Sequence, residues 1–451
     1  MRLIMVLNYE LRLLISNSEF PIHYNVFKTI HPFTERIIMP STATRLKDFT
    51  ESIFSEFPWE LIIKDWEGNS YSIGLKKKHW RGEPLVFSIK TEAAAKDVLS
   101  LNVMRFLERY LDGEVDLEGN LYLLCLLRTH AKIKLSPLST FMLLASNLSK
   151  TYLFQDISRA KENVKSHYDI PQETLNTYLD RVYMSYSCGM FEHPERLSVE
   201  ELTSIGKGQE DKFDSLEKSQ WRKFKDAVDF IAPEKGETLL DIGSGYGGQL
   251  AVALESHPFG KVVGWTHSRN QYLEGQKLLS GFDKSRWELN EGDYRQDDRI
   301  FDHITSTGMF CHVGPRGLVP YVQNVRKRIK KGGRYMHHGM MEPFSTVPFD
   351  SHVGVAFQKK YVWPGFHYFS LKDHVKALEE NGFRVLRAVN LTKHYEKTTA
   401  AWNERMMANK EIMTKNLGEP TFRAWRVYLA GISGAFSENS ILIYRVYTEA
   451  V

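Results

Sequence analysis

The stretch from Thr238 to Ser256, TLLDIGSGYGGQLAVALES, limits the possible folds of this chain more than any other. Thr238 to Ile242 predicts a short buried strand, Gly243 to Gly248 a tight loop, and Gln249 to Ser256 the start of a helix. Four glycines so close together cost conformational entropy unless the backbone must turn sharply or lie bare there. The stretch therefore predicts the first β-loop-α unit of a doubly wound sheet.

The residues that follow repeat this alternation of strand and helix. Further strands are expected at Lys261 to Thr266, Trp287 to Leu289, Phe301 to Thr305 and Gly333 to His338. Alternating strands and helices predict an α/β fold with a mainly parallel, Rossmann-like sheet and a ligand at the carboxyl ends of the strands.

The glycine loop matches GxGxxG, which alone is a weak signal for a dinucleotide. A dinucleotide site would also need an acidic residue at the end of the next strand, where this chain has Thr266, His267 and Ser268. Asp241 instead completes the pattern DxGxGxG, which is typical of methyltransferases that use S-adenosylmethionine (SAM). A glycine turn that serves only close packing is the alternative.

A second, smaller domain is expected before this sheet. ELIIKDWEGNSYSIGL predicts two short strands around Gly68, and the following residues, to about 150, show helical spacing of apolar residues with turns at Gly113 and Gly119. We expect an α+β domain at 39–150 and a catalytic domain at 151–451, with a helical entry at 151–235, a sheet core at 236–345 and a C-terminal cover at 346–451. Residues 1–38 are interpreted as a loose extension or an incorrectly assigned start.

Composition excludes several classes of protein. The 451 residues carry a formal charge of only +4, too small for a dedicated nucleic-acid binder. No apolar run reaches the roughly 18 residues that a spanning helix needs. Three scattered cysteines encode neither a disulfide framework nor a CxxC metal site, and a reducing cytoplasm fits them best. Adjacent His337 and His338 on a strand point to opposite faces, so no metal is expected there.

Several segments, taken in order, carry a more specific signal. They are HYDI at His167, YMSYSCGMF at Tyr183, LLDIGSGYGG, VVGWTHSRNQ, GMFCHVGP at Gly308, GGRYMHH, KKYVWPG, HYEKTTAAW and FRAWRVYLAGISGAF. Together they resemble the cyclopropane fatty-acid synthase family, including its mycolic-acid-modifying relatives. The segment FLERYLDGEVDLEGNLYLL is similar to the small N-terminal domain of full-length bacterial members. The resemblance implies a SAM-dependent methyltransferase that acts on the double bond of phospholipid acyl chains, with cyclopropanation as the default product.

The resemblance also implies which residues bind the cofactor. The matching positions are Tyr186, Ser187, Asp241, Gly243, Gly245, Thr266, Gln271, Gly292 and Asp293. The T-x-S-x-x-Q pattern from Thr266 to Gln271 would replace the acidic residue missing after the second strand. Each position has a simpler alternative: Asp293 caps a turn, for example, or Gln271 is a solvated helix residue.

The family's reaction ends with loss of a proton, which in the family a bound bicarbonate accepts. The anion lies near the cysteine of YSC and is held by a Glu, a His and a Tyr, and the counterparts implied here are Cys188, His338 and Tyr361. The Glu is replaced by Cys311, which removes a strong acceptor and a negative charge. Three outcomes stay open: the anion binds without the Glu, Cys311 takes part with a lowered pKa, or ring closure fails and leaves a methyl or methylene branch. Cys311 as a small buried apolar residue is the simplest interpretation.

The expected partner is phospholipid at the inner face of the membrane. Lys76, Lys77 and Lys78, with Trp80 and Arg81, combine positive charge with an indole, as expected of a surface that meets anionic headgroups. A solvated turn between strands explains the same residues equally well. The oligomeric state, a homodimer included, is left open.

Two other functions remain as alternatives. Alkaloid N-methyltransferases share this fold, so a small amine is a second substrate class, although the N-terminal domain argues against it. A non-catalytic protein that binds lipid or SAM would explain the missing Glu, although the intact DIGSGYG loop argues against decay.

Overall fold

The computed structural model of the chain describes residues 40–131, 171–206, 212–343, 353–363 and 365–451. The chain divides into two units, Met1–Ser41 and Thr42–Val451, and every element described below belongs to the second. The expected extension at 1–38, the predicted boundary near residue 150 and the HYDI segment lie outside the described residues.

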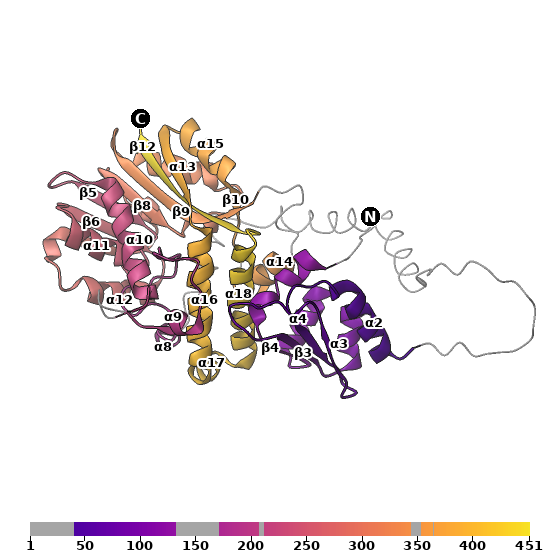
Figure 1. Ribbon diagram of the computed structural model, residues 1–451. Helices are drawn as coiled ribbons and strands as arrows, with labels where there is room; N and C mark the ends of the chain where they lie inside the picture. Colours follow the sequence, from indigo (N-terminus) through magenta and orange to yellow (C-terminus); the bar gives the residue numbers. More distant parts are fainter. Residues whose placement is uncertain (1–39, 132–170, 207–211, 344–352, 364) are drawn as a thin grey trace, which may run out of the picture. The chain divides into compact units, whose positions relative to one another are not determined.

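The larger sheet is mixed and mostly parallel. Its strands run in the order β11-β12-β9-β8-β5-β6-β7, with β10 beside β9. The strands β5 to β9 are parallel, whereas β12 runs in the opposite direction between β9 and the edge strand β11. The predicted doubly wound α/β fold is therefore confirmed (Figure 1). The strands are β5 (Thr238–Ile242), β6 (Lys261–Thr266), β7 (Trp287–Glu291), β8 (His303–Thr307), β9 (Arg334–Glu342), β10 (Phe369–Ser370), β11 (Phe383–Asn390) and β12 (Leu442–Ala450).

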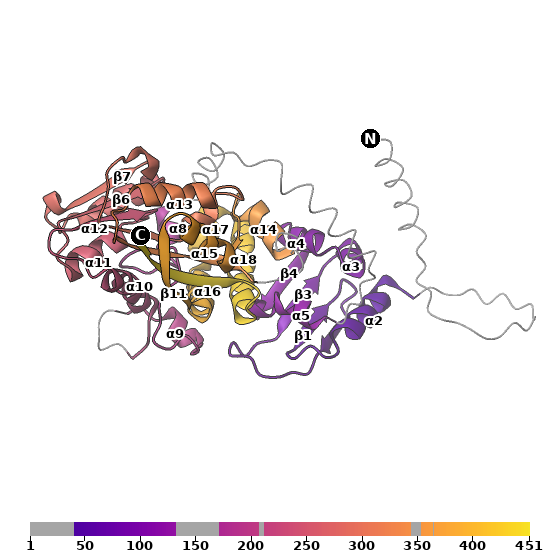
Figure 2. The same cartoon turned by 90° about the horizontal axis from the view of Figure 1, so that it is seen from above.

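The order of the strands reverses beside β5, because β6 and β7 follow on one side of it and β8 and β9 on the other. Such a reversal opens a crevice at the carboxyl ends of the strands. Figures 1 and 2 show α10, α11 and α12 on one face of the sheet, and α13 and α15 on the other, as right-handed crossovers require. These helices are α10 (Leu216–Ile231), α11 (Gly248–Ser256), α12 (Arg269–Leu279), α13 (Leu318–Lys327) and α15 (Leu371–Glu380).

Two strand predictions need correction. The strand expected at 301–305 lies at His303–Thr307, because Phe301 instead forms an isolated bridge with Ile329. The strand expected to end at His338 continues to Glu342, because it pairs with β12 along this length. The longer β9 brings Gly339 and Met340 to the same edge as the glycine loop.

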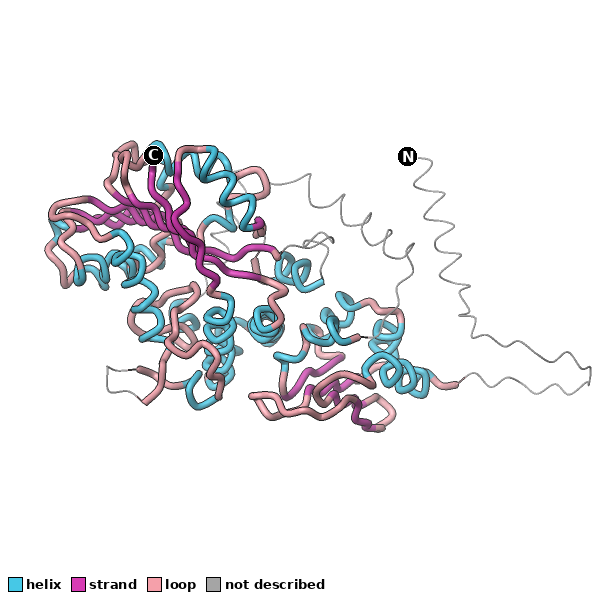
Figure 3. Tube along the Cα trace, turned by 45° about the horizontal axis from the view of Figure 1, so that its top comes forward, coloured by secondary structure: helices cyan, strands magenta, loops and turns pink. Residues whose placement is uncertain are grey.

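The smaller sheet has the order β2-β1-β3-β4. The two strands expected around Gly68 are present as β1 and β2. The stretch expected to be helical contains a strand as well, because Gly113 and Gly119 turn the chain and Val115 and Leu117 alternate into the core between them. Figure 3 shows this sheet in magenta beside its helices. The elements are α2 (Thr42–Phe54), β1 (Leu61–Lys64), β2 (Ser70–Ile73), β3 (Leu85–Ile89), α3 (Glu92–Leu99), α4 (Val103–Leu111) and β4 (Val115–Gly119).

The helical entry expected before the sheet is mostly irregular where the structure describes it. Residues 171–206 form only the short helices α8 (Gln172–Leu175) and α9 (Val199–Thr203), and α10 follows. The buried Asp180 holds a turn here, because its carboxylate accepts the backbone N–H groups of Tyr183 and Ser185, each at 2.6 Å. Side chains thus satisfy peptide groups that a helix would have paired.

Two long C-terminal helices, α16 (Thr392–Ala408) and α18 (Glu419–Ser437), pack together, and α16 contacts β12 of the larger sheet while α18 contacts α4 beside the smaller sheet. Toward the smaller sheet, Glu404 accepts a hydrogen bond from Tyr122 at 2.8 Å and pairs with Arg81 at 3.2 Å. None of the helices in the described part of the chain combines the length and the apolar character that a bilayer crossing requires.

Candidate active site

The glycine loop leaves bare backbone at the carboxyl end of β5. Gly243 and Gly245 have φ values of 76° and 54°, in the left-handed region that favours glycine. A Cβ on Gly243 would lie 2.9 Å from Met309, whereas a Cβ on Gly245 would meet no atom within 4 Å. Gly243 therefore serves close packing, and Gly245 presents peptide groups to open space at the start of α11. This open cradle fits a ligand that approaches the backbone closely, as SAM would.

Asp241 lies buried at the base of this loop. The hydroxyl of Thr305 donates a hydrogen bond to its Oδ1 at 2.7 Å. Burial raises the pKa of Asp241 to about 7, although Thr305 and the ammonium of Lys223 act against this rise. An ammonium group in the crevice would favour the ionised carboxylate. The site is therefore suited to the methionine end of SAM.

Thr266 and Gln271 meet at the end of β6. Both side chains are buried, and Thr266 Oγ1 donates to Gln271 Oε1 at 2.7 Å. Ser268 caps α12 by accepting the backbone N–H of Gln271 at 3.3 Å. The alternative that Gln271 is a solvated helix residue is wrong.

Gly292 and Asp293 follow β7 beside this pair. The Gly292 N–H donates to the carbonyl oxygen of Thr266 at 2.9 Å. Asp293 accepts the N–H of Arg295 at 2.9 Å and also pairs with its guanidinium. Although burial acts in the opposite direction, these bonds hold the pKa of Asp293 below its usual value. Asp293 thus caps a turn, as the simpler alternative held.

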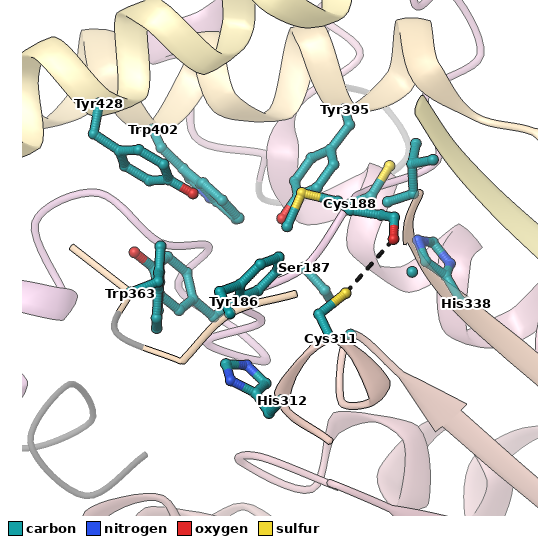
Figure 4. Close-up of a pocket in the computed structure, with 15 residues that line it drawn as sticks. Tyr186, Ser187, Cys188, Cys311, His312, His338, Trp363, Tyr395, Trp402 and Tyr428 are labelled. Carbon is teal, nitrogen blue, oxygen red and sulfur yellow. Dashed lines mark hydrogen bonds between the residues drawn. The ribbon is translucent and has the colours of Figure 1, made fainter. Parts of the chain in front are cut away.

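A pocket beyond the glycine loop collects side chains from segments far apart in the sequence (Figure 4). Aromatic rings form much of its wall, and none of the described residues that line it is Asp, Glu, Lys or Arg. An aromatic, uncharged wall accepts an apolar chain, and ring faces stabilise a nearby cation. The lining residues are Tyr186, Ser187, Cys188, Gly308, Cys311, His312, His338, Gly339, Met340, Trp363, Phe366, Tyr395, Trp402, Tyr428 and Ile443.

The hydrogen bonds of His338, which lines the pocket, determine the tautomer of its ring. Its Nδ1 accepts hydrogen bonds from Nε and Nη2 of Arg445, both at 3.2 Å. Burial, with Arg445 nearby, keeps the pKa of His338 well below its usual value, so the ring is neutral. Because Nδ1 is the acceptor, Nε2 carries the proton. Nε2 is buried and has no hydrogen-bond partner among the described residues, so His338 offers the pocket a donor and not a base.

Cys188 and Cys311 both line the pocket as buried thiols. Cys311 Sγ donates to the carbonyl oxygen of Met340 at 3.6 Å, and Cys188 Sγ to that of Gly189 at 3.2 Å. Burial raises the pKa of each thiol to about 12. Participation of Cys311 through a lowered pKa, one of the three outcomes considered, is therefore contradicted, and the thiol acts as a small buried group.

Tyr361 does not reach this pocket. Its hydroxyl donates to Glu108 Oε1 at 3.2 Å on α4, and its ring packs on Phe357. Instead, Tyr395 of the HYEKTTAAW segment on α16 lines the pocket together with Cys188, Cys311 and His338. The segment forms part of the family resemblance, but nothing in the sequence shows that its tyrosine lines the pocket together with residues of β9.

The sequence also did not indicate several other residues of the pocket. His312 follows Cys311 directly, whereas Trp363, Trp402 and Tyr428 are contributed by three different segments. Their rings form one cluster around Tyr186, whose centroid lies 5.0 Å from that of Trp402 and 5.4 Å from that of Trp363. Aromatic residues in helices normally indicate an apolar core, so their type alone carries no sign of a pocket.

Comparison with known proteins identifies a family. Residues 155–446 match the family model described as mycolic acid cyclopropane synthetase. A probable fatty acid methyltransferase of Pseudomonas putida is 31% identical over 290 residues, which are 63% of this chain and 68% of that protein. The cyclopropane-fatty-acyl-phospholipid synthase of Escherichia coli K12 is 28% identical over 66% of this chain and 70% of its own.

Solved structures show the same fold. The cyclopropane synthase MmaA2 from Mycobacterium tuberculosis superimposes with a TM-score of 0.57 at 23% identity, covering 65% of this chain and 100% of that one. Mycolic acid cyclopropane synthase CmaA1, solved with SAH and CTAB, gives a TM-score of 0.56 at 24% identity over 64% of this chain and 98% of its own. At this level of identity the likeness concerns the fold.

Proposed function

The chain belongs to the mycolic acid cyclopropane synthetase family and is a SAM-dependent methyltransferase, and from this premise we propose that it methylates the double bond of unsaturated phospholipid acyl chains. The observation that carries the proposal is the uncharged aromatic pocket beside the glycine loop. None of the described lining residues is a carboxylate that could pair with a protonated small amine, whereas an acyl chain needs only apolar contact and exclusion of water.

The cofactor would lie along Asp241, Gly245 and Thr266, with Tyr186 and Ser187 between it and the pocket. When bound, SAM supplies an electrophilic methyl group on a sulfonium. An alkene is a weak nucleophile, so the protein must align the two groups and keep water away. The rings of Tyr186, Trp363 and Trp402 are suited to both tasks, since their faces also stabilise positive charge.

Ring closure requires an acceptor for a proton, and the protein side of the pocket offers no strong base. The thiols of Cys188 and Cys311 are protonated, and Nδ1 of His338 is occupied by Arg445. The Nε2–H of His338 fits an anion in the pocket, and bicarbonate is the anion that family resemblance implies. Tyr395, which takes the place expected for Tyr361, would be its second partner.

Cyclopropanation is the proposed product, and a methylene branch is the second candidate because Cys311 supplies no carboxylate. Expression of the protein in bacteria that lack such enzymes, followed by fatty-acid analysis, tests both. Either product adds one CH₂ unit to a monounsaturated chain. Cyclopropane protons in the NMR spectrum support the first, olefinic protons of a branched chain support the second, and unaltered fatty acids contradict the proposal.

The loop from Leu75 to Lys78 is the proposed contact with anionic headgroups. Leu75 is 54% exposed, and Lys76, Lys77 and Lys78 are exposed beside it, although Lys76 also pairs with Glu60 at 3.1 Å. Trp80 takes no part, because its ring packs on that of Tyr122 with centroids 4.8 Å apart. Each lysine near an anionic surface contributes about 1 kcal/mol.

Vesicle sedimentation with anionic phospholipid tests this contact. The variant with Lys76, Lys77 and Lys78 replaced by Ala should bind vesicles at least ~10-fold more weakly at low salt. The matched control replaces three exposed lysines elsewhere, Lys235, Lys277 and Lys372, and removes the same net charge. Equal loss in both variants would contradict a localised contact.

A further inference from the structure

Helix α10 carries a lysine whose ammonium is completely buried beside the pocket. Lys223 has no exposed surface, and its Nζ donates to Ser187 Oγ at 2.8 Å, to Gln220 Oε1 at 2.5 Å and to Ser185 Oγ. Taking an ammonium out of water costs several kcal/mol even when it is hydrogen-bonded. A hydrophobic residue would stabilise the fold at lower cost, so the charge calls for a functional explanation.

One partner of Lys223, Ser187, belongs to the wall of the pocket. Ser185 and Ser187 flank Tyr186, and Ser187 and Cys188 line the pocket directly. The same helix holds this segment a second time, because Gln220 Nε2 donates to the carbonyl oxygen of Ser187 at 2.9 Å. The ammonium of Lys223 therefore fixes the hydroxyls of Ser185 and Ser187, on both sides of Tyr186, which lines the pocket.

Charged and titratable groups surround Lys223 on every side. The carboxylates of Asp180 and Asp241 favour its protonated form, as would a Cys188 thiolate, whereas Arg445 opposes it. His338 also faces it, as a neutral ring. Burial, together with Arg445, lowers the pKa of Lys223 to about 7. The ammonium thus stands between the turn before the YSC segment and the strand that carries the glycine loop.

Lys223 also contacts the residue that orients His338. Its backbone oxygen accepts a hydrogen bond from Arg445 Nη1 at 3.0 Å, and Arg445 donates to His338 Nδ1. Asp226, one turn further along α10, pairs with the same guanidinium at 2.6 Å. This part of α10 therefore contacts Ser187 in the wall of the pocket and also Arg445, which orients the ring of His338.

We infer that Lys223 is a positioning residue whose protonated side chain clamps Ser185 and Ser187, so that the Tyr186–Cys188 wall is held in place for the cofactor and for methyl transfer. Loss of the proton removes the clamp, because a neutral amine binds the two hydroxyls and Gln220 more weakly. The part of this inference that concerns methyl transfer rests on the proposed function, whereas the part that concerns cofactor binding does not.

The trend of cofactor affinity with pH, set against that of stability, separates a positioning lysine from a purely structural one. The pKa of Lys223 lies lower in the folded protein than in the unfolded chain, where it has its ordinary value of 10.5. The unfolded chain therefore binds more protons between about pH 7 and pH 10, and Lys223 makes stability rise with pH there. We expect cofactor affinity and transfer to fall over the same interval. Opposite trends in stability and affinity separate positioning from support of the fold.

The test is calorimetric titration of the purified protein with S-adenosylhomocysteine (SAH) at several pH values, which needs no lipid. Asp241 ionises in the same interval, so the affinity of the wild type is compared at each pH with that of Lys223→Met, which keeps Asp241. Lys223→Met should bind SAH about 10-fold more weakly than the wild type at pH 6 and about equally at pH 9. Lys225→Met, on the same helix but paired at the surface with Asp229, should match the wild type at every pH.

Ser185→Ala keeps the charge but removes one clamped hydroxyl, and it decides the matter should Lys223→Met fail to fold. It should weaken SAH binding at pH 6 and reduce the pH-dependent decline. A Lys223→Met or Ser185→Ala protein with the wild-type profile overturns the inference. A wild type that binds SAH with this profile but transfers no methyl group to lipid overturns the proposed substrate and leaves the role of Lys223 supported.

Discussion

The two halves of the site are built in opposite ways. The cofactor side comes from three consecutive strand ends, β5, β6 and β7, and consists of bare backbone and polar side chains such as Asp241 and Gln271. The pocket side comes from segments scattered between Tyr186 and Ile443, and its described lining is aromatic and uncharged. On the proposed function, the first half holds a polar, charged cofactor and the second admits an apolar chain. Reactants of such different polarity meet only where the two halves join.

The largest expected effect concerns the donor of the pocket side. His338→Ala removes the Nε2–H that faces the pocket and should lower methyl transfer to lipid about 100-fold, as loss of a single oriented donor does elsewhere. SAH affinity should stay within about twofold, because the cofactor side is untouched. Transfer rates and calorimetry on one preparation check both. A loss of SAH affinity equal to the loss of transfer would contradict the assignment of His338 to the pocket side alone.

A paired substitution tests which tyrosine belongs to the pocket. Tyr395→Phe should reduce transfer about 10-fold, because it removes a hydroxyl from a residue that lines the pocket and little else. Tyr361→Phe is the matched control and should change transfer less than about twofold, since its hydroxyl binds Glu108 outside the pocket. Initial rates with labelled SAM measure both. A larger loss of transfer in Tyr361→Phe than in Tyr395→Phe would support Tyr361, as expected from the sequence, and contradict Tyr395.

The carboxylate of the cofactor side should affect stability through pH. The pKa of Asp241 rises from 3.8 to about 7 on folding, so the folded protein binds more protons than the unfolded chain between these values. Its contribution to stability is present at low pH and is lost as the pH rises toward 7. Asp241→Asn cannot lose a proton, so in urea unfolding it should gain ~1–2 kcal/mol relative to the wild type from pH 4 to pH 7. A constant difference would contradict the raised pKa.

The smallest expected effect is at Cys311, the position where the family resemblance implies a Glu. Cys311→Ala should leave transfer within about threefold, because a thiol whose pKa is raised to about 12 supplies neither a base nor a nucleophile. The unfolding free energy should fall by about 1 kcal/mol from the small cavity. Cys311→Ser keeps the approximate volume and can also donate to the carbonyl oxygen of Met340. A loss of transfer well beyond threefold in both Ala and Ser would contradict a passive role for the thiol.

The same contrast explains what could be read from the sequence. Asp241, Gly243 and Gly245 lie in one continuous motif, so the doubly wound sheet and the place of the cofactor followed from local patterns. Tyr395 could not be separated from Tyr361 in this way, because both stand in segments that carry the resemblance, and only the tertiary packing that brings α16 to the pocket distinguishes them. The clamp of Lys223 was hidden for the same reason, since a lysine within a polar helical stretch normally indicates solvent.

The central claim is that a sulfonium methyl group reaches an unsaturated acyl chain inside the pocket. The most direct measurement incubates the purified protein with methyl-labelled SAM and vesicles of a monounsaturated phospholipid, beside vesicles of the saturated lipid with the same headgroup. The account predicts label in the acyl chains of the unsaturated lipid alone. Label in the headgroup, or equal label in the saturated lipid, would contradict it.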